Sequence, residues 1–392
     1  MRFLLLFSII LCTSYLNAQS WQQLIDFPGS PRDDAAGFNI NDKYYCGTGR
    51  DDGFNCTRDF YRFNGITQIW ESATPLPIGE NRQYSTGFAY DGNGYILCGN
   101  NCSAGYLNSF WKFDSSSEQW TPLPALPASG RAGCVHFIIG DSLYLVGGQN
   151  TNGILNEVWR YCFTSQEWVQ KSNLPVPGIW RGLGFSYANS GYIGAGKTLS
   201  NAWNYQTLKY DPMMDNWSDF PMLNFGTRTY VGLVQRDSYL YVFGGLDSLN
   251  QTLTSFEKFD LNDYSRLTLP TFSSTARKGI FCFAHNSAFY LTTGISGYTR
   301  LKETWKLDYV LEILPAKFIN LIVYPVPTSN LFTLEVDSID IGKEIILKDD
   351  FGKTVLISYS NSNNNQISIA HLQNGVYFLI YRKQIIKIIK ID

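Results

Sequence analysis

Six arginines recur at a nearly constant spacing and are the residues of this sequence best suited to bind a charged ligand. They are Arg32, Arg82, Arg131, Arg181, Arg228 and Arg277, about 49 residues apart. A guanidinium binds carboxylate and sulfate groups through paired hydrogen bonds, so a ring of arginines could bind a carboxylate or a sulfated or sialylated sugar. The alternative is structural: the arginines would hold neighbouring units together through backbone carbonyls and acids such as Asp33, Asp34 and Glu80.

Metal and nucleophile chemistry have little support. The three histidines, His136, His285 and His371, are too few for a copper site. The stretch RDDGFN at 50–55 resembles part of a calcium loop but has no distal glutamate. The sequence contains no nucleophile elbow, phosphate loop or zinc spacing, so we expect no metal, no cofactor and no assignable catalytic residue.

The first residues have the pattern of a secretory signal peptide. Arg2 precedes an apolar run that ends at Leu11, and small or polar residues continue to Ala18, so we expect cleavage between Ala18 and Gln19. The run is too short to span a membrane. The whole chain has a formal net charge of −2, with 16% aromatic residues and 34 glycines. This composition favours an all-β protein and gives no basic field for nucleic acid.

Of the eight cysteines, Cys12 lies in the leader. Export to an oxidising compartment permits disulfides. Cys46 and Cys56, like Cys98 and Cys102, are close in sequence and flank equivalent loops, so we expect the pairs Cys46–Cys56 and Cys98–Cys102. The remaining odd number leaves at least one thiol unpaired or intermolecular. The alternative is that all seven are small buried apolar residues.

The arginines belong to a larger repeat. Tryptophans recur at the same spacing, as Trp21, Trp70, Trp120, Trp168 and Trp217. Between each arginine and the next tryptophan lie two strand-like stretches, such as LYLVGG at 143–148 and FWKFD at 110–114. Each unit therefore predicts four antiparallel strands, which bury their apolar faces only against neighbouring units.

These residues resemble the kelch motif, in which a glycine-paired strand precedes an aromatic strand that ends in Asp, with a Trp shortly after it, as in Asp114 and Trp120. The resemblance runs from Trp21 to about Tyr309 and implies a β-propeller. It departs from the motif at Ala195-Gly196, at Thr293-Gly294 and at Arg266, which stands where Trp is expected. Six arginines predict six blades. The last blade has no Trp-marked fourth strand, so we expect the N-terminal strand at Trp21 to close the ring.

Strand direction places the candidate ligand-binding residues together. In a four-stranded antiparallel blade, the loop entering the first strand and the loop between the second and third strands lie at the same end. We therefore expect the six arginines to ring one mouth of a central channel. Arg50, Gln149 and Lys197, from loops that follow the glycine-marked strands, should lie beside them and contribute to ligand binding.

The repeat stops at about Leu311, where short strands separated by Pro, Asn and Gly predict a small antiparallel β-sandwich. Four stretches, VYPVP at 323–327, DDFGKTVL at 349–356, ISIAHLQNGVYFLIY at 367–381 and the ending IIKIIK, resemble the type A sorting domain of the type IX secretion system of Bacteroidetes. The resemblance implies contact with the secretion machinery and passage through the periplasm and outer membrane. It also implies removal of the tail, with the protein released or attached to surface lipopolysaccharide.

The sequence thus predicts a signal peptide over 1–18, an all-β six-bladed kelch propeller over 19–312 and a sorting domain over 313–392. We expect a secreted or cell-surface module that binds a protein or glycan ligand or acts as a scaffold, without a nucleic-acid partner or a transmembrane segment. The alternative is a carbohydrate-modifying enzyme of the sialic acid mutarotase or epimerase kind, which shares the blade number and the exported location.

Overall fold

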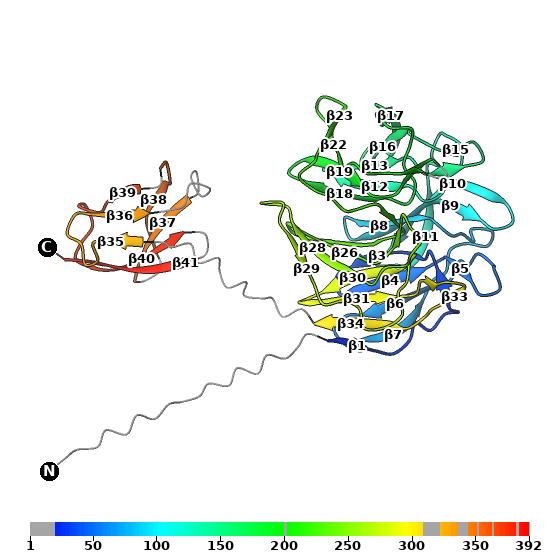
Figure 1. Ribbon diagram of the computed structural model, residues 1–392, viewed down its shortest axis with the longest axis horizontal. Helices are drawn as coiled ribbons and strands as arrows, with labels where there is room; N and C mark the ends of the chain where they lie inside the picture. Colours follow the sequence, from blue (N-terminus) through cyan, green and yellow to red (C-terminus); the bar gives the residue numbers. More distant parts are fainter. Residues whose placement is uncertain are drawn as a thin grey trace, which may run out of the picture. The chain divides into compact units, whose positions relative to one another are not determined.

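The computed structural model describes residues 20–199, 202–308, 322–335, 344–350, 353–362, 364–381 and 384–391. These residues form strands and turns without a helix, and hence without a helix that could cross a membrane. The expected signal peptide and its cleavage site between Ala18 and Gln19 lie outside the described residues. The chain divides into two compact units, one within residues 1–310 and one within residues 311–392 (Figure 1).

Within its described residues, the first unit contains six four-stranded antiparallel sheets, which we number one to six. From the innermost strand outward they are β3 (Ala36–Ile40), β4 (Lys43–Gly47), β6 (Phe60–Asn64) and β7 (Ile69–Ala73); β8 (Thr86–Tyr90), β9 (Asn93–Asn101), β10 (Gly105–Asp114) and β11 (Gln119–Leu123); β12 (Val135–Ile139), β13 (Ser142–Val146), β16 (Val158–Cys162) and β17 (Glu167–Lys171); β18 (Leu183–Tyr187), β19 (Ser190–Gly194), β22 (Leu208–Asp211) and β23 (Asn216–Asp219); β25 (Gly232–Arg236), β26 (Tyr239–Phe243), β28 (Phe256–Asp260) and β29 (Arg266–Thr268); β30 (Phe281–His285), β31 (Ala288–Thr292), β34 (Thr304–Asp308) and β1 (Trp21–Gln23).

Short two-stranded ribbons extend from five of the sheets, and Figure 1 shows β5, β15 and β33 on the same side of the unit. The ribbons are β2 (Arg32–Asp33) with β5 (Arg50–Asp51), β14 (Gln149–Asn150) with β15 (Gly153–Ile154), β20 (Lys197–Leu199) with β21 (Ala202–Trp203), β24 (Arg228–Thr229) with β27 (Leu246–Asp247), and β32 (Ile295–Ser296) with β33 (Thr299–Arg300).

The second strands are covered on both faces by neighbouring sheets. Every residue of β13, β19 and β31 is buried, which explains why these strands have apolar or small residues at consecutive positions rather than at alternate ones. Aromatic rings fill the space between sheets: Phe38 of sheet one lies 5.6 Å from Phe113 and 5.9 Å from Trp120 of sheet two, measured between ring centroids. Each sheet therefore completes its core with the next one.

Strand β1 supplies the outer strand of sheet six, where Trp21 pairs with Leu307. The Trp21 indole donates a hydrogen bond to the Pro270 carbonyl of the preceding sheet at 3.2 Å. The repeated tryptophans of sheets two, three and four make the same kind of bond: Trp120 to Thr74, Trp168 to Pro124 and Trp217 to Ser172, at 2.9, 2.9 and 3.1 Å. Trp21 therefore has in sheet six the role that these tryptophans have in their own sheets.

The second unit contains a three-stranded and a four-stranded sheet among its described residues. Their orders are β35 (Ile322–Tyr324), β36 (Leu331–Glu335), β39 (Asn364–Ser368), and β38 (Thr354–Tyr359), β37 (Glu344–Asp349), β40 (Gly375–Tyr381), β41 (Gln384–Lys390). Alternate side chains of both sheets form one core, with Phe332 and Leu334 from the first sheet against Leu347 and Leu379 from the second. Two sheets that share a core make the predicted β-sandwich.

Candidate functional site

Five of the six repeated arginines are buried inside the protein. Their side chains are at most 6% exposed, and each forms an ion pair: Arg32 with Asp59, Arg82 with Glu80, Arg131 with Glu157, Arg228 with Glu257 and Arg277 with Glu303. Four of them also donate from Nη1 to a carbonyl of the sheet that they enter, at Thr48, Cys98, Gly147 and Thr293. These internal ion pairs and hydrogen bonds favour the structural alternative, and ligand binding by the five arginines at a channel mouth stays a prediction.

The sixth, Arg181, does not belong to that series. Backbone bonds between consecutive sheets mark the repeat position: the carbonyl of Arg82 accepts from Gly49, and that of Arg131 accepts from Gly99. In sheet four the corresponding acceptor is the fully buried Ile179, whose carbonyl accepts a hydrogen bond from the Gly148 amide at 2.8 Å. Arg181 therefore lies two residues beyond the repeat position and has a different environment from the other arginines.

Arg181 belongs instead to a set of equivalent residues on the axis, which we call the axial ring. Its members are Asp34, Tyr84, Gly133, Arg181, Tyr230 and Gly279. All six have positive φ, between 52° and 65°. Their backbones are linked across sheets, because Arg181 donates to Gly133, Tyr230 to Arg181, Gly279 to Tyr230, Asp34 to Gly279 and Gly133 to Tyr84. The fold thus brings together six residues that the sequence separates widely.

Four side chains of the axial ring meet at its centre. The Arg181 guanidinium forms an ion pair with Asp34 and lies between two aromatic rings, with Cζ 3.5 Å from the Tyr230 centroid and 4.4 Å from that of Tyr84. Gly279 makes room for the carboxylate, since a Cβ there would lie 2.6 Å from Asp34 Oδ1. A cation stacked on two aromatic faces is favourable, particularly away from water.

The Asp34–Arg181 pair keeps unused hydrogen-bonding capacity. Within the described residues, Asp34 Oδ2 and Arg181 Nε are buried and have no hydrogen-bond partner. Burial raises the pKa of Asp34 to about 7, although the neighbouring Arg181 charge acts to lower it. Buried groups without partners and a carboxyl that titrates near neutrality are typical of functional sites.

The other predicted binding residues have local partners. Arg50 donates from Nε to the Phe54 carbonyl at 3.1 Å. Gln149 pairs through its backbone with Ala132. Lys197 pairs through its backbone with Trp180. Trp180 directly precedes Arg181, which belongs to the axial ring.

A cavity of about 760 Å³ lies along the inner strands, next to the axial ring. A narrower space of about 140 Å³ reaches the ring itself and shares five lining residues with the cavity: Ala35, Ser85, Cys134, Val231 and Ile280. The two spaces are therefore continuous along the channel, and the cavity extends to the hairpins that join first and second strands, near Asp42 and Asn286. Its volume is in the range of small-molecule sites.

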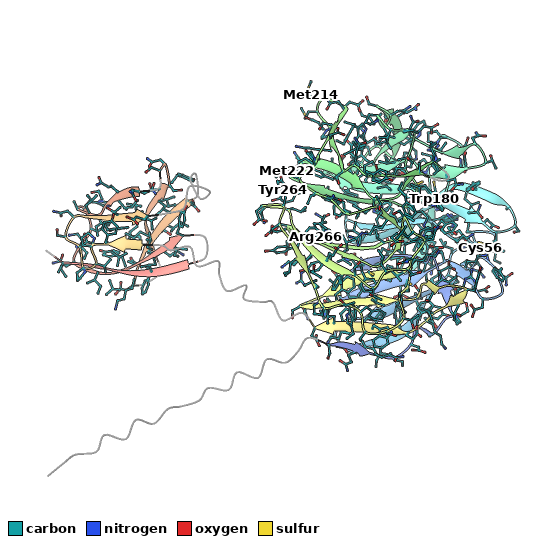
Figure 2. The ribbon with its side chains drawn as sticks, in the orientation of Figure 1. Cys56, Trp180, Met214, Met222, Tyr264 and Arg266 are labelled. Carbon is teal, nitrogen blue, oxygen red and sulfur yellow. A yellow bond between two sulfur atoms is a disulfide. The ribbon has the colours of Figure 1, made fainter. Side chains whose placement is uncertain are left out.

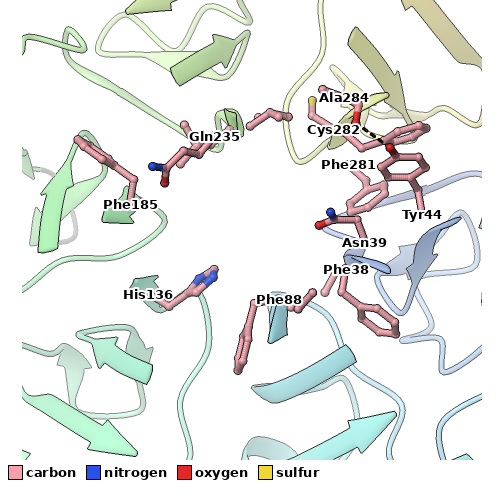
Figure 3. Close-up of a pocket in the computed structure, with 18 of the residues that line it drawn as sticks. Phe38, Asn39, Tyr44, Phe88, His136, Phe185, Gln235, Phe281, Cys282 and Ala284 are labelled. Atoms are coloured by element: carbon pink, nitrogen blue, oxygen red, sulfur yellow. Dashed lines mark hydrogen bonds between the residues drawn. The ribbon is translucent and has the colours of Figure 1, made fainter. Parts of the chain in front are cut away.

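Two ionisable side chains, Asp42 and Arg236, line the cavity, and beside them Asn39, His136 and Gln235 form a hydrogen-bonding lining that carries no charge at neutral pH. Asn39, His136 and Gln235 surround a common opening and come from sheets one, three and five (Figure 3). Burial lowers the pKa of His136 to about 4, which keeps its imidazole neutral. Gln235 donates to the Ser186 carbonyl at 2.7 Å. These three side chains can donate and accept hydrogen bonds without a fixed charge.

The sequence interpretation missed Asn39 and Gln235 because it searched the opposite end of the channel. A signal was available in the first strands of three sheets, where polar side chains stand at equivalent positions: Asn39, Ser186 and Gln235. Polar residues inside an otherwise apolar innermost strand indicate a polar channel lining.

One disulfide joins Cys56 to Cys102, from the loops of sheets one and two (Figure 2 labels Cys56). The predicted pairs Cys46–Cys56 and Cys98–Cys102 are wrong. Cys46 and Cys98 are free thiols buried in the second strands β4 and β9, where they pack in the core. Burial raises the pKa of Cys46, so its thiol stays protonated and inert.

Comparison with known families identifies two kinds of module in the chain. The family model of the KLHDC2/KLHL20/DRC7 Kelch-repeats domain matches residues 38–230, and that of the Kelch motif matches residues 227–272. The model of the Secretion system C-terminal sorting domain matches residues 322–391. The search of curated proteins found no match. Both resemblances inferred from the sequence, to kelch repeats and to the sorting domain, are confirmed.

Proposed function

Because the chain carries kelch repeats followed by the C-terminal sorting domain of the type IX secretion system, we propose that it is an exported propeller that binds a carbohydrate in its central cavity. The sorting domain supports secretion or delivery to the cell surface by this system, whose machinery is then its partner. We assign residues 19–312 to the propeller and residues 313–392 to the sorting domain.

The observation that carries the proposal is the set of uncharged, hydrogen-bonding side chains, Asn39, His136 and Gln235, that line the cavity. Sugar hydroxyls donate and accept at once, and the amides of Asn39 and Gln235 can do both. Phe281 also lines the cavity and offers an apolar surface to the C–H groups of a sugar. A protein partner would instead need roughly 800 Å² of surface on each side, which a cavity does not offer.

The test is a glycan array, followed by calorimetry of the glycan that binds best. We expect Gln235→Ala and Asn39→Ala to weaken that glycan about tenfold each, because each removes a hydrogen bond worth about 1 kcal/mol and leaves the sugar hydroxyl unpaired. Gln119→Ala is the matched control, since Gln119 is exposed on the outer strand β11. Equal affinity of all three variants would exclude the cavity as the binding site.

A carbohydrate-modifying activity is the second candidate, and Asp34 is the observation that favours it. Its carboxyl lines the narrow space that adjoins the cavity and titrates near pH 7. A group with such a pKa can both donate and accept a proton at neutral pH, as the opening and closing of a sugar ring require.

This activity would be detected as anomeric exchange of a bound sugar, followed by proton NMR. We expect exchange faster than in buffer for the wild type and buffer-level exchange for Asp34→Asn, with Asp52→Asn, at an exposed position that lines neither space, unchanged. If the wild type does not accelerate exchange of the sugar that it binds, the protein is a binding module without this activity.

A further inference from the structure

A second group of side chains adjoins the axial ring and consists of two ring members that line the narrow space, Arg181 and Tyr230, and three residues that line neither space. Trp180 and Lys278 each directly precede a member of the axial ring, Arg181 and Gly279 respectively. Neither Trp180 nor Lys278 lines the cavity or the narrow space, and both are partly exposed. Figure 2 labels Trp180 among the side chains of the first unit. We call Trp180, Arg181, Lys197, Tyr230 and Lys278 the outer cluster.

The members of the outer cluster are close to one another. The Trp180 and Tyr230 ring centroids are 5.5 Å apart, and the Lys278 ammonium lies 5.0 Å from the Tyr230 centroid. Lys197 pairs through its backbone with Trp180, and its ammonium charge acts on Lys278. The fold therefore places Arg181 and Lys278 against these aromatic rings. The Lys197 ammonium lies instead 4.8 Å from the Trp203 ring centroid.

Positive charge exceeds negative charge in this region. Asp33 forms an ion pair with Arg300, with 2.6 Å between Oδ1 and Nε, and Asp34 forms an ion pair with Arg181. Among the residues that the structure describes, Lys197 and Lys278 have no salt bridge. Burial lowers the pKa of Lys278, with a further lowering effect from Arg181 and Lys197 against the attraction of Asp34 and Asp33. An anion would relieve the repulsion among these cations.

We propose that the outer cluster is a second binding site, which takes the carboxylate or sulfate group of an acidic sugar between Arg181, Lys197 and Lys278. The two aromatic rings provide the surface on which the sugar packs. Arg181 Nε, buried with no partner among the described residues on a side chain only 9% exposed, is a donor with unused hydrogen-bonding capacity in this cluster. A guanidinium and two ammonium groups suit an oxyanion, and an aromatic surface suits the sugar that carries it.

The site has a defined pH dependence. Asp34 is the negative charge nearest to Arg181, and its carboxyl loses that charge as the pH falls through about 7. Tyr84 and Tyr230 stay neutral because burial raises the pKa of both hydroxyls. Asp33 is neutralised by Arg300 at close range. Anion affinity should therefore rise as the pH falls from about 8 to about 6, when Asp34 becomes protonated and Lys278 remains charged.

The experiment titrates the full chain with glucuronic acid, glucose 6-sulfate, inorganic sulfate and glucose, by calorimetry at low salt. We expect both acidic sugars to bind more tightly than inorganic sulfate, since only they can use the aromatic rings. The relative affinities of the first two identify carboxylate or sulfate as the preferred group. Lys278→Gln should weaken the acidic sugars about tenfold, the loss expected for one charge-assisted hydrogen bond. Lys302→Gln, at an exposed position outside the cluster, is the matched control.

The readouts separate this site from the cavity. Lys278→Gln should leave the affinity of the cavity-binding glycan unchanged, whereas Gln235→Ala should weaken that glycan and leave the acidic sugars unaffected. Equal affinity of the Lys278 and Lys302 variants for acidic sugars, failure of both acidic sugars to bind, or affinity that does not increase at lower pH would each overturn the second site.

Discussion

Removal of residues 20–28 from a chain made without its leader is expected to abolish cooperative unfolding of the first unit and to cause aggregation. Trp21 packs against Phe243, Phe256, Phe272 and Phe289, with ring centroids 4.9 to 6.0 Å away. Phe27 is fully buried, 5.0 Å from Tyr61 of sheet one. The segment therefore bonds to sheet six while it packs against sheets five and one, and its loss exposes the edge of β34.

The size of the effect can be bounded from a single residue. Trp21→Ala alone should cost about 3–5 kcal/mol, as for other large core side chains, which is a large part of the roughly 5–15 kcal/mol that stabilises a typical domain. Thermal unfolding followed by circular dichroism, with light scattering, measures both variants. Gln22→Ala, exposed on the same strand, is the control. A truncated chain that stays monomeric and unfolds at the wild-type temperature would refute closure by β1.

Deletion of residues 322–391 is expected to leave the protein in the periplasm, because it can no longer cross the outer membrane. These residues match the sorting domain and form their own core of Phe332, Leu334, Leu347 and Leu379. The propeller should still fold, since its sheets form core clusters of their own. Fractionation of a host with a type IX system, followed by immunoblotting, locates the protein.

A gain-of-function control makes the export test independent of propeller folding. Residues 311–392 fused to a periplasmic reporter should send the reporter out of the cell, and Leu347→Asp in that fusion should stop export by disrupting the sandwich core. Export of the truncated propeller at the wild-type level would show that the sorting assignment does not account for its secretion.

The repeat made most of the fold readable from the sequence. A four-strand unit with a tryptophan in its last strand is a local pattern, and its recurrence predicts neighbouring sheets that cover each other. The same pattern predicted that the strand at Trp21, which has no preceding strands of its own, completes the last sheet. The indole bond to Pro270 places Trp21 in the role that the repeated tryptophans have in their own sheets.

The ligand-binding residues were harder to predict from the sequence, because residue type alone does not show which residue holds the repeat position in each sheet. Arg181 fits the spacing of the arginines almost as well as Ile179 does, yet only the backbone bond from Gly148 shows that Ile179 holds the repeat position. The five true repeat arginines are buried, and each forms an ion pair inside the protein. A charged residue that departs from its repeat, as Arg181 does, is the better candidate for a role outside the repeat.

The predicted cysteine pairing was wrong for a related reason. Closeness in sequence favoured Cys46 with Cys56, but Cys46 lies within strand β4, whereas Cys56 lies in the loop between β4 and β6. Cys46 faces the core, whereas Cys56 faces the loop of the next sheet and meets Cys102. Contacts between sheets, which bring together residues about one repeat apart, decide both the disulfide and the axial ring.

The most direct test of the central claim is a crystal structure of the full chain with the glycan selected by the array. The account predicts electron density for the sugar inside the central cavity, within hydrogen-bond distance of Asn39 and Gln235 and beside His136. A sugar bound only on the outer surface of the loops, or no glycan bound at all, would contradict it.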